Sequence, residues 1–441
     1  MEDAKQVVAC WQSLLQPYQS VFTAPGWVRF AQWATGTVLC DEEHTITQIV
    51  SRMGVPQWWR VAESFAEYGV FDLPSARAAT MRLVEARCPE KFGGYRSVAL
   101  DDTKEQRSSR KVWGACTYKQ TSSRNPKHPK IQLAHNWVEV GDLSPGEPWT
   151  YLPTGALLYM RESQLPAGET FRTKLELGAS LLGEVDAASA GRVLAIFDGG
   201  NARKGLIGPC LKGFGKDRPV AILTRPRKDA RLYAPVDRTQ DAKRVAKKGG
   251  RPRKWGQRLP SPEHYKQWRN PWHKGRAWIY GQERSFRCKS MDCRWSVSGA
   301  EDPVRVYVFE VEGYSQPWFL VTSALDLSEG EAVEGYAARF RQEDGFRDHK
   351  QQMGMEEVRA WTKQPVLRTY MVQLIAMTLM RLLMKEAADK WGSWYAPPAW
   401  NRRKKVPSLR DMRRLLWDHR EGLINFLREL DEVRKPRLAA A

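Results

Sequence analysis

The sequence predicts a mixed α/β protein, in which a β-rich segment interrupts a sheet-based core, with a helical domain before the core and a helical tail after it. Three observations support this fold class. Helical patterning runs to about residue 94, strand-like and helical segments alternate from residue 95, and this alternation breaks between about 226 and 325. With 42% apolar and 27% charged residues, the composition is that of a folded protein. A length of 441 residues exceeds what one core usually organises, so we expect several domains.

The first segment, 1–94, is expected to be a helical domain. Within it, 41–53 and 55–68 read as short helices on either side of Gly54, which is the pattern of a helix-turn-helix. Helix pairs joined through a glycine are also common in all-α domains that bind no DNA. DNA recognition by this pair is therefore one hypothesis, and a purely structural helix pair is the other.

The first part of the core is expected over 95–240. Strands are predicted at 97–100, 130–140, 149–160, 193–197 and 219–224, with a helix at 173–190 before the fourth strand. Ligands in such sheets gather outside the carboxyl ends of the strands. Asp101 and Asp102 follow the first strand and Asp198 follows the run 193–197, so these carboxylates mark the predicted site.

A basic loop and a β-rich insertion subdomain are expected over 241–325, with strands near 304–311 and 318–323. Residues 243–258 contain no acid, and their density of cations indicates contact with phosphates or with the minor groove of DNA. The residues expected to bind DNA here are Lys247, Lys248, Arg251, Arg253 and Lys254. Gly250-Arg251-Pro252 resembles the core of an AT-hook. A solvated loop is the alternative interpretation.

The second part of the core, 326–395, is expected to begin with a helix over about 329–353. Ser328 and Glu331 are spaced as a capping box before it, and Gly354 follows its last turn. A second helix begins near Pro365 and continues to about 391. Its apolar stretch, 371–384, is too short to span a bilayer, so we expect a buried helix and no membrane partner. The basic helical tail, 396–441, is a candidate dimerisation element.

One face of the helix 329–353 is unusually polar. Its residues recur at spacings of three or four, within an arc of roughly 80 degrees: Tyr336, Arg339, Glu343, Arg347 and Lys350. A phosphate-bearing substrate and metal ions would supply partners for such a face. A solvated helix with intrahelical ion pairs between Glu343 and its arginine neighbours is the alternative.

Two aspartates and then a glutamate, each on a separate element, suit divalent metals. Mg²⁺ takes hard oxygen ligands, and two ions about 4 Å apart can activate the attacking oxygen and stabilise the leaving oxygen of a phosphoryl transfer. We therefore expect Mg²⁺, with Mn²⁺ as a substitute, at two ions per site.

The spacing Tyr336-x2-Arg339-x3-Glu343-x6-Lys350 resembles the Tyr-Arg-Glu-Lys signature of bacterial insertion-sequence DDE transposases. Residues 100–103, 196–199 and 318–323 resemble the neighbouring strands of that family, so the likeness covers roughly 95–385. The resemblance implies an RNase H-like core interrupted by a β insertion.

By this resemblance, Asp101, Asp198 and Glu343 would be the metal ligands and the catalytic acids. The pattern Asp-x-Thr favours Asp101, whereas its neighbour Asp102, which a regular strand would point the opposite way, remains the alternative. Tyr336, Arg339 and Lys350 would hold phosphates. Trp318 matches the place where relatives stack a flipped base, and a core tryptophan at the start of a strand is the alternative reading.

The resemblance implies cut-and-paste transposition as the function. The protein would cleave DNA at the ends of an insertion sequence, through a hairpin formed at the end, and would then transfer the strands to target DNA. Its partners would be double-stranded DNA, as terminal inverted repeats and as target, and a second copy of the chain. Alternatives are an RNase H-fold nuclease without strand transfer and a domesticated, inactive DNA-binding protein.

Charge and the N-terminus agree with a DNA-bound location. A formal charge of +20 indicates a polyanionic partner. Acids stand at positions 2 and 3 and no basic region precedes an apolar stretch, so no secretory signal is expected. We therefore expect a cytoplasmic protein associated with the bacterial nucleoid.

Overall fold

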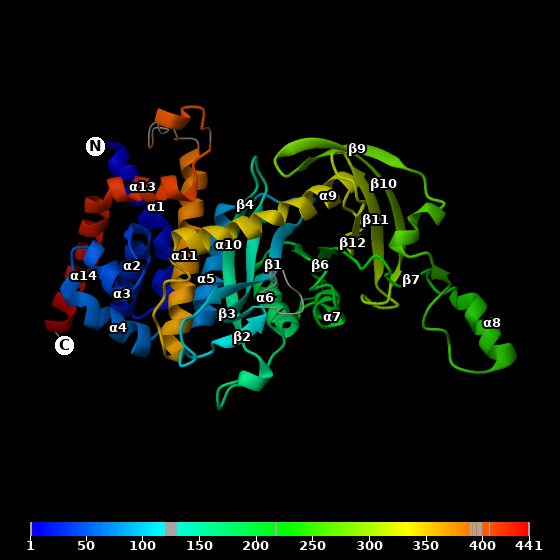
Figure 1. Cartoon of the computed structure of the whole chain (residues 1–441), viewed down its shortest axis with the longest axis horizontal. Coiled ribbons are helices and arrows are strands. Elements are labelled where there is room, and N and C mark those ends of the chain that lie inside the picture. The colour runs from blue at the N-terminus through cyan, green and yellow to red at the C-terminus, as the bar shows by residue number, and fades with distance from the viewer. Residues whose placement is uncertain are drawn as a thin grey trace.

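The computed structural model describes the backbone of residues 2–119, 130–216, 218–388, 390, 394, 399–404 and 406–439. The chain is arranged as a helical bundle at one end, a sheet covered by helices in the middle, and a β-rich region at the other end (Figure 1). Both termini lie in the helical bundle, and α8 stands out at the opposite end.

The helical bundle brings together the two ends of the chain. Its helices are α1 (Glu2–Leu15), α2 (Ala24–Leu39), α3 (Ile46–Arg52), α4 (Trp59–Tyr68), α5 (Leu73–Arg87), α11 (Lys363–Ala388), α13 (Leu409–Asp418) and α14 (Arg420–Ala439). Residues of all eight helices contribute to one apolar core. The N-terminal segment and the C-terminal tail, which were predicted as separate units, therefore pack around α11.

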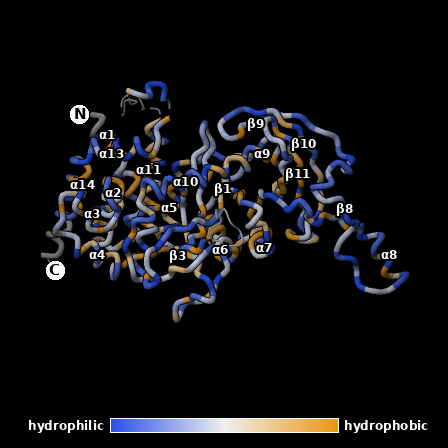
Figure 2. The backbone as a smooth tube through the Cα atoms, viewed as in Figure 1, coloured by the Kyte–Doolittle hydropathy of each residue, from blue (hydrophilic) through white to orange (hydrophobic). Residues whose placement is uncertain are grey.

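Helix α11 is the buried centre of this bundle, as its apolar stretch predicts. It is the one helix of the described residues that is long and apolar enough to cross a membrane, and 94% of that apolar window is buried inside the protein. Figure 2 shows the hydrophobic colour concentrated in the bundle and the sheet, whereas α8 is mostly hydrophilic.

The described strands form one mixed sheet. They are β1 (Arg96–Gln106), β2 (Cys116–Lys119), β3 (Ile131–Ser144), β4 (Thr150–Tyr159), β5 (Val193–Phe197), β6 (Ala221–Thr224), β7 (Leu232–Tyr233), β8 (Arg258–Leu259), β9 (His273–Ile279), β10 (Gln282–Trp295), β11 (Pro303–Val311) and β12 (Trp318–Thr322). The order is β2-β3-β1-β5-β6-β12-β11-β10-β7-β8, with β4 beside β3 and β9 beside β10. β1, β5 and β6 are parallel, and β12 joins β6 antiparallel. The β-rich segment thus continues the sheet of the core.

Helices cover both faces of the central strands. On one face, α6 (Lys174–Ala188) and α7 (Lys204–Lys212) pack on Val98 and Leu100. On the other, α9 (Glu329–Ala338) packs against a core that includes Ala99. Because successive side chains of a strand point to opposite faces, this burial pattern assigns Asp101 to the face of α9 and Asp102 to the face of α6.

The two aspartates lie inside β1, not at its end as predicted, because β1 continues to Gln106. Pairing with β3 extends from Val98↔Asp142 to Gln106↔Ala134, and this long partner strand keeps β1 extended beyond its apolar residues. Asp198, by contrast, directly follows β5, as predicted.

The helix predicted over 329–353 is divided at Arg339 into α9 and α10 (Phe340–Gln352). At this point the backbone N–H of Arg339 donates to Tyr336 O, three residues back, at 3.3 Å. The predicted capping box of Ser328 and Glu331 is confirmed. Gly354 follows the last turn at a φ of 63°, the left-handed conformation that a glycine after a helix adopts readily.

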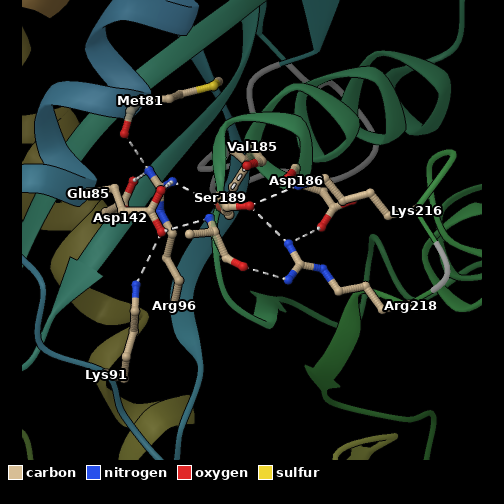
Figure 3. A network of polar contacts seen from close by, with 11 residues as sticks. Met81, Glu85, Lys91, Arg96, Asp142, Val185, Asp186, Ser189, Lys216 and Arg218 are labelled. Atoms are coloured by element: carbon tan, nitrogen blue, oxygen red, sulfur yellow. Dashed lines mark hydrogen bonds and ion pairs between the residues drawn. The ribbon is translucent and has the colours of Figure 1, made fainter.

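A buried polar network braces the beginning of β1 (Figure 3). Arg96, which is 3% exposed, donates to Asp142 Oδ1 on β3 at 2.5 Å and to Asp142 Oδ2 at 2.9 Å. It also donates to Ser189 Oγ and to Met81 O, each at 2.9 Å. The network ties the strand that bears Asp101 to β3, to α5 and to the end of α6.

Candidate active site

Asp101 and Asp198 lie on neighbouring parallel strands at the same level of the sheet. Leu100 is in register with Phe197, and each aspartate is the next residue. The Asp198 carboxylate is oriented by Asn201, whose backbone N–H donates to Oδ1 at 3.1 Å and whose side-chain amide donates to it at 3.3 Å. A Cβ at Gly200 would lie 3.2 Å from the same oxygen, so the tight turn leaves little space there for a larger residue.

Arg339 connects Asp101 to Glu343. Its Nη1 lies 3.2 Å from Asp101 Oδ2, and its Nη2 lies 3.0 Å from Glu343 Oε1. The arginine side chain is 14% exposed and that of Glu343 is 47% exposed. The guanidinium therefore lies between a carboxylate on the sheet and one on α10.

Electrostatics distinguish Asp101 from an ordinary surface acid. Burial and the nearby charge of Asp198 raise the pKa of Asp101 to about 6, against the lowering effects of the Asp102 N–H and of Arg339. Tyr336 is buried beside the same groups, and burial raises its pKa while Arg339 lowers it. Two neighbouring carboxylates that repel each other suit a bound cation.

Asp102 faces the other way. Its Oδ2 lies 2.6 Å from Lys174 Nζ at the start of α6. The Asn136 amide, with its nitrogen turned toward the strand, donates to the same oxygen at 3.0 Å. Asp102 is thus engaged on the α6 face, and of the two candidates only Asp101 shares a partner with Glu343.

The other polar residues of the predicted helix face separate from this cluster. Arg347 is 57% exposed and pairs with Asp344 at 2.9 Å, and Lys350 Nζ lies 3.8 Å from Glu356. Of the two ion pairs in the solvated-helix alternative, Arg339 to Glu343 is present, whereas Arg347 pairs with Asp344 instead of Glu343.

A second buried network holds α10 against the sheet. Glu139 on β3 is in register with Asp101, and its two carboxylate oxygens accept from Tyr151 Oη and Tyr370 Oη, each at 2.8 Å. Gln342, next to Glu343, donates to Glu139 O at 3.1 Å and to Tyr151 Oη at 3.2 Å. These bonds position the turn of α10 that bears Glu343.

Sequence reasoning missed two cations and the network around Glu139. Lys174 pairs with Asp102, and the charge of Arg225 lowers the pKa of Tyr336. Arg225 directly follows β6, the third parallel strand, so the same strand-end rule that indicated Asp198 would have found it. Lys174 and Glu139 carry no local signal, because their roles come from pairing across the sheet and with α6.

An aromatic cluster borders the site. Trp318, at the start of β12, is 9% exposed and lies 5.0 Å from Tyr314 and 5.9 Å from Tyr280, between ring centroids. Tyr280 also meets Phe340 at 5.5 Å. Tyr280 and Phe340 are 46% and 43% exposed, so they present more ring surface to solvent than Trp318 does.

Two DNA-binding hypotheses fall outside this cluster. The basic residues of 243–258 lie on α8 (Arg238–Lys248) and its following loop, at the far end of the molecule from the helical bundle (Figure 1). Helices α3 and α4 form the predicted pair, but α4 bears Glu63 and Glu67 against the single cation Arg60. Its charge thus offers little attraction for phosphate, and recognition by this pair stays a hypothesis.

The donor chemistry fits a divalent cation only in part. Carboxylate oxygens of Asp101 and Asp198 are ligands of the kind that Mg²⁺ prefers. Among the residues that the structure describes, however, no group of three or more His, Cys, Asp or Glu side chains lies close enough to hold a metal ion. The third carboxylate, Glu343, is engaged with Arg339.

A mixed α/β sheet with two aspartates on adjacent parallel strands, facing a helix that carries a glutamate, is the arrangement of a DDE-type nuclease. Comparison with protein families agrees: residues 22–287, more than half of the chain, match the family described as DDE superfamily endonuclease. The chain therefore belongs to this family of transposase-like nucleases, which act on DNA and generally use divalent metals. The match includes Asp101 and Asp198 and ends before Glu343. A comparison with curated proteins finds no match.

Proposed function

We propose that this protein is the transposase of a bacterial insertion sequence, which cleaves the ends of its element and joins them to target DNA by a cut-and-paste route. One observation carries the proposal. Within the Tyr-Arg-Glu-Lys spacing, Arg339 contacts both Asp101 and Glu343, and the buried Tyr336 lies near Arg339 and Asp198. A nuclease needs the carboxylates alone, whereas the accompanying cation and phenol suit a phosphate that must be held for a second reaction.

In this proposal Asp101, Asp198 and Glu343 would hold two Mg²⁺ ions, which Mn²⁺ could replace. When bound, such ions activate the attacking oxygen and stabilise the leaving oxygen of a phosphoryl transfer. To join the two aspartates, the Glu343 carboxylate would leave Arg339, and the guanidinium, released by Glu343 and by Asp101, would then bind a phosphate.

Chain residues around the acids position the DNA. Arg339 and Tyr336 hold phosphate oxygens near the cleaved bond, and Lys350 and Arg347 extend this contact along α10. Trp318 stacks a base displaced from the end, with the exposed rings of Tyr280 and Phe340 beside it. Stacking is tolerant of sequence because every base has a π-face.

The core is of the RNase H type in this proposal, with β7 to β12 as the insertion before the glutamate helix. Excision proceeds through a hairpin at the element's end, and two copies of the chain act on paired ends, with the C-terminal helices as the candidate dimer contact. The protein would work in the cytoplasm, on the nucleoid.

The test is cleavage and joining of labelled duplexes that are tiled across the DNA flanking the gene, with Mg²⁺ or Mn²⁺. Wild type is compared with Glu343→Gln, which keeps the side chain's shape and removes its charge. Glu162→Gln, an identical change at an exposed position outside the acids and the C-terminal helices, is the matched control.

We expect wild type and Glu162→Gln to nick the end and join it to target, and Glu343→Gln to bind DNA without cutting. Cleavage without joined product would identify a nuclease that lacks strand transfer. DNA binding with no metal-dependent cleavage by wild type would identify an inactive DNA-binding protein, and equal activity of all three would remove Glu343 from the mechanism.

A further inference from the structure

Residues 238–258 form a projecting arm at the edge of the sheet. It consists of α8 and the loop that returns from α8 to β8, and it begins and ends at the small β7–β8 pair, the last pair in the strand order. Figure 1 shows α8 standing away from the sheet, at the end opposite the helical bundle. The arm is therefore exposed to a partner that does not enter the candidate active site.

The arm concentrates positive charge that the protein leaves unpaired. Nine Lys and Arg residues stand in 238–258 against one acid, Asp241. Arg238 pairs with Glu301 and Arg244 pairs with Asp241. The other seven form no salt bridge with any residue that the structure describes, and all are exposed: Lys243, Lys247, Lys248, Arg251, Arg253, Lys254 and Arg258. Like charges at this density repel one another, and a bound polyanion would relieve this repulsion.

The loop is fastened to the helix through its backbone. Asp241, which is 6% exposed, accepts from Arg244 Nε at 2.8 Å through one oxygen and from the backbone N–H of Arg253 at 2.8 Å through the other. Arg244 Nη2 donates to Arg251 O at 3.0 Å, and Arg238 Nη1 donates to Arg253 O at 3.3 Å. Helix and loop thus behave as one body, with the cationic side chains on its outside.

This construction excludes one of the two DNA-binding modes that the sequence leaves open. A minor groove is about 6 Å wide, whereas an α-helix with its side chains is about 10–12 Å across. The segment Arg251-Pro252-Arg253 cannot lie along the floor of that groove while its backbone is bonded to α8. The phosphates on the outside of a duplex remain accessible to the exposed cations of the arm.

We propose that the arm grips the phosphate backbone of a DNA duplex, without reading its sequence and away from the acids that cut it. This inference rests on the proposed function for the identity of the polyanion. The arm then contributes to DNA affinity independently of the candidate active site. This contribution is electrostatic and therefore sensitive to salt.

The experiment measures binding of a random-sequence duplex of about 30 base pairs between roughly 50 and 200 mM salt, without divalent metal. The arm variant replaces Lys243, Lys247, Lys248 and Lys254 together by alanine. These side chains are exposed, and alanine favours the helix at the three positions within α8, so circular dichroism and the melting temperature should be unchanged. The matched control removes four exposed cations from the helical bundle and its neighbourhood: Lys5, Arg82, Arg402 and Arg403.

Each phosphate contact contributes about 0.9 to the slope of log K against log salt, so we expect the arm variant to lower the slope by about 3 to 4. At about 100 mM salt its affinity should fall at least tenfold. The control should keep the wild-type slope. An unchanged slope in the arm variant would overturn the proposal.

A ligand that occupies the minor groove of A·T-rich DNA separates the two binding modes. We expect it to leave the difference between wild type and the arm variant intact, and A·T-rich and G·C-rich duplexes to bind alike. Loss of that difference in the presence of the ligand would show minor-groove insertion and overturn the proposal.

The outcomes also distinguish this inference from the proposed function. Wild type that shows the arm's salt slope but never joins DNA ends would refute transposition and leave the arm's role standing. If wild type joins DNA ends but the arm variant keeps the wild-type slope, transposition would stand and the arm's role would be refuted.

Discussion

Replacing Glu139 by glutamine is expected to stabilise the folded protein at alkaline pH relative to wild type, in which the buried Glu139 carboxyl must ionise. Glu139 is fully buried, and its carboxylate oxygens accept from Tyr151 and Tyr370. Burial nevertheless outweighs these hydrogen bonds and raises the pKa of Glu139 from 4.5 to about 7. The amide of glutamine has almost the same shape and does not titrate.

The sign of the effect follows from proton binding. Between pH 4.5 and about 7 the folded protein keeps the Glu139 proton that the unfolded chain has released. The free energy of unfolding therefore falls as pH rises through this window. A shift of this size corresponds to about 3 kcal/mol. The Glu139→Gln variant avoids this loss, so its stability relative to wild type should rise by about 3 kcal/mol between pH 4.5 and pH 8.

The assay compares melting temperatures of wild type and Glu139→Gln at pH 5 and at pH 8, with Glu429→Gln as an exposed control. We expect the difference between variant and wild type to move by roughly 3 °C in favour of the variant at the higher pH. Asp101, whose pKa is also raised, titrates in both proteins and cancels in this difference. A difference that is the same at both pH values would refute the reasoning, because Glu139 would then be ionised throughout.

Three further predictions concern individual side chains. Asp142→Asn should destabilise the protein by about 3 kcal/mol, because Asp142 is the nearest counter-charge of the buried Arg96 and its loss leaves only Glu85, at 3.5 Å. Asp229→Asn, in an exposed pair, should leave the melting temperature almost unchanged, and equal shifts of the two variants in thermal melting would show that burial is unimportant. Asp101→Asn should abolish cleavage of a labelled end, whereas Asp102→Asn should retain at least about a tenth of the wild-type cleavage rate. The reverse result would identify Asp102 as the first catalytic acid. Trp318→Phe should keep the rate of end cleavage within about tenfold of wild type, because phenylalanine keeps a π-face, whereas Trp318→Ala should lose cleavage. Equal rates for the two variants would remove the stacking role of Trp318.

Much of the candidate site could be predicted because its signals are local. The capping box at Ser328 and Glu331 involves residues within one helical turn, and the structure confirms it. The apolar run that ends before Asp198 forms β5 within the predicted bounds, Val193–Phe197. The spacing of Tyr336, Arg339 and Glu343 predicts a shared face, and the structure brings them to one side of the sheet despite the break at Arg339.

The remainder depended on partners that are distant in sequence. β1 extends past its apolar residues because β3 pairs with its whole length, which no pattern within 96–106 reveals. The network of Glu139, Tyr151, Gln342 and Tyr370 joins two strands and two helices, and each of these residues alone reads as an ordinary strand or helix position. The first and last helices also share one apolar core, and this contact too joins residues that are distant in sequence.

The sequence by itself therefore determined the class of fold, the order of the three acids, the polar helix face and the basic segment, because periodicity, spacing and charge are properties of neighbouring residues. Only the tertiary structure decided that Asp101, and not Asp102, shares Arg339 with Glu343, since the side that each residue faces is fixed by what packs on β1. It also decided that the basic segment is a braced arm and not a free loop, because the bonds that fasten it join α8 to residues beyond the turn.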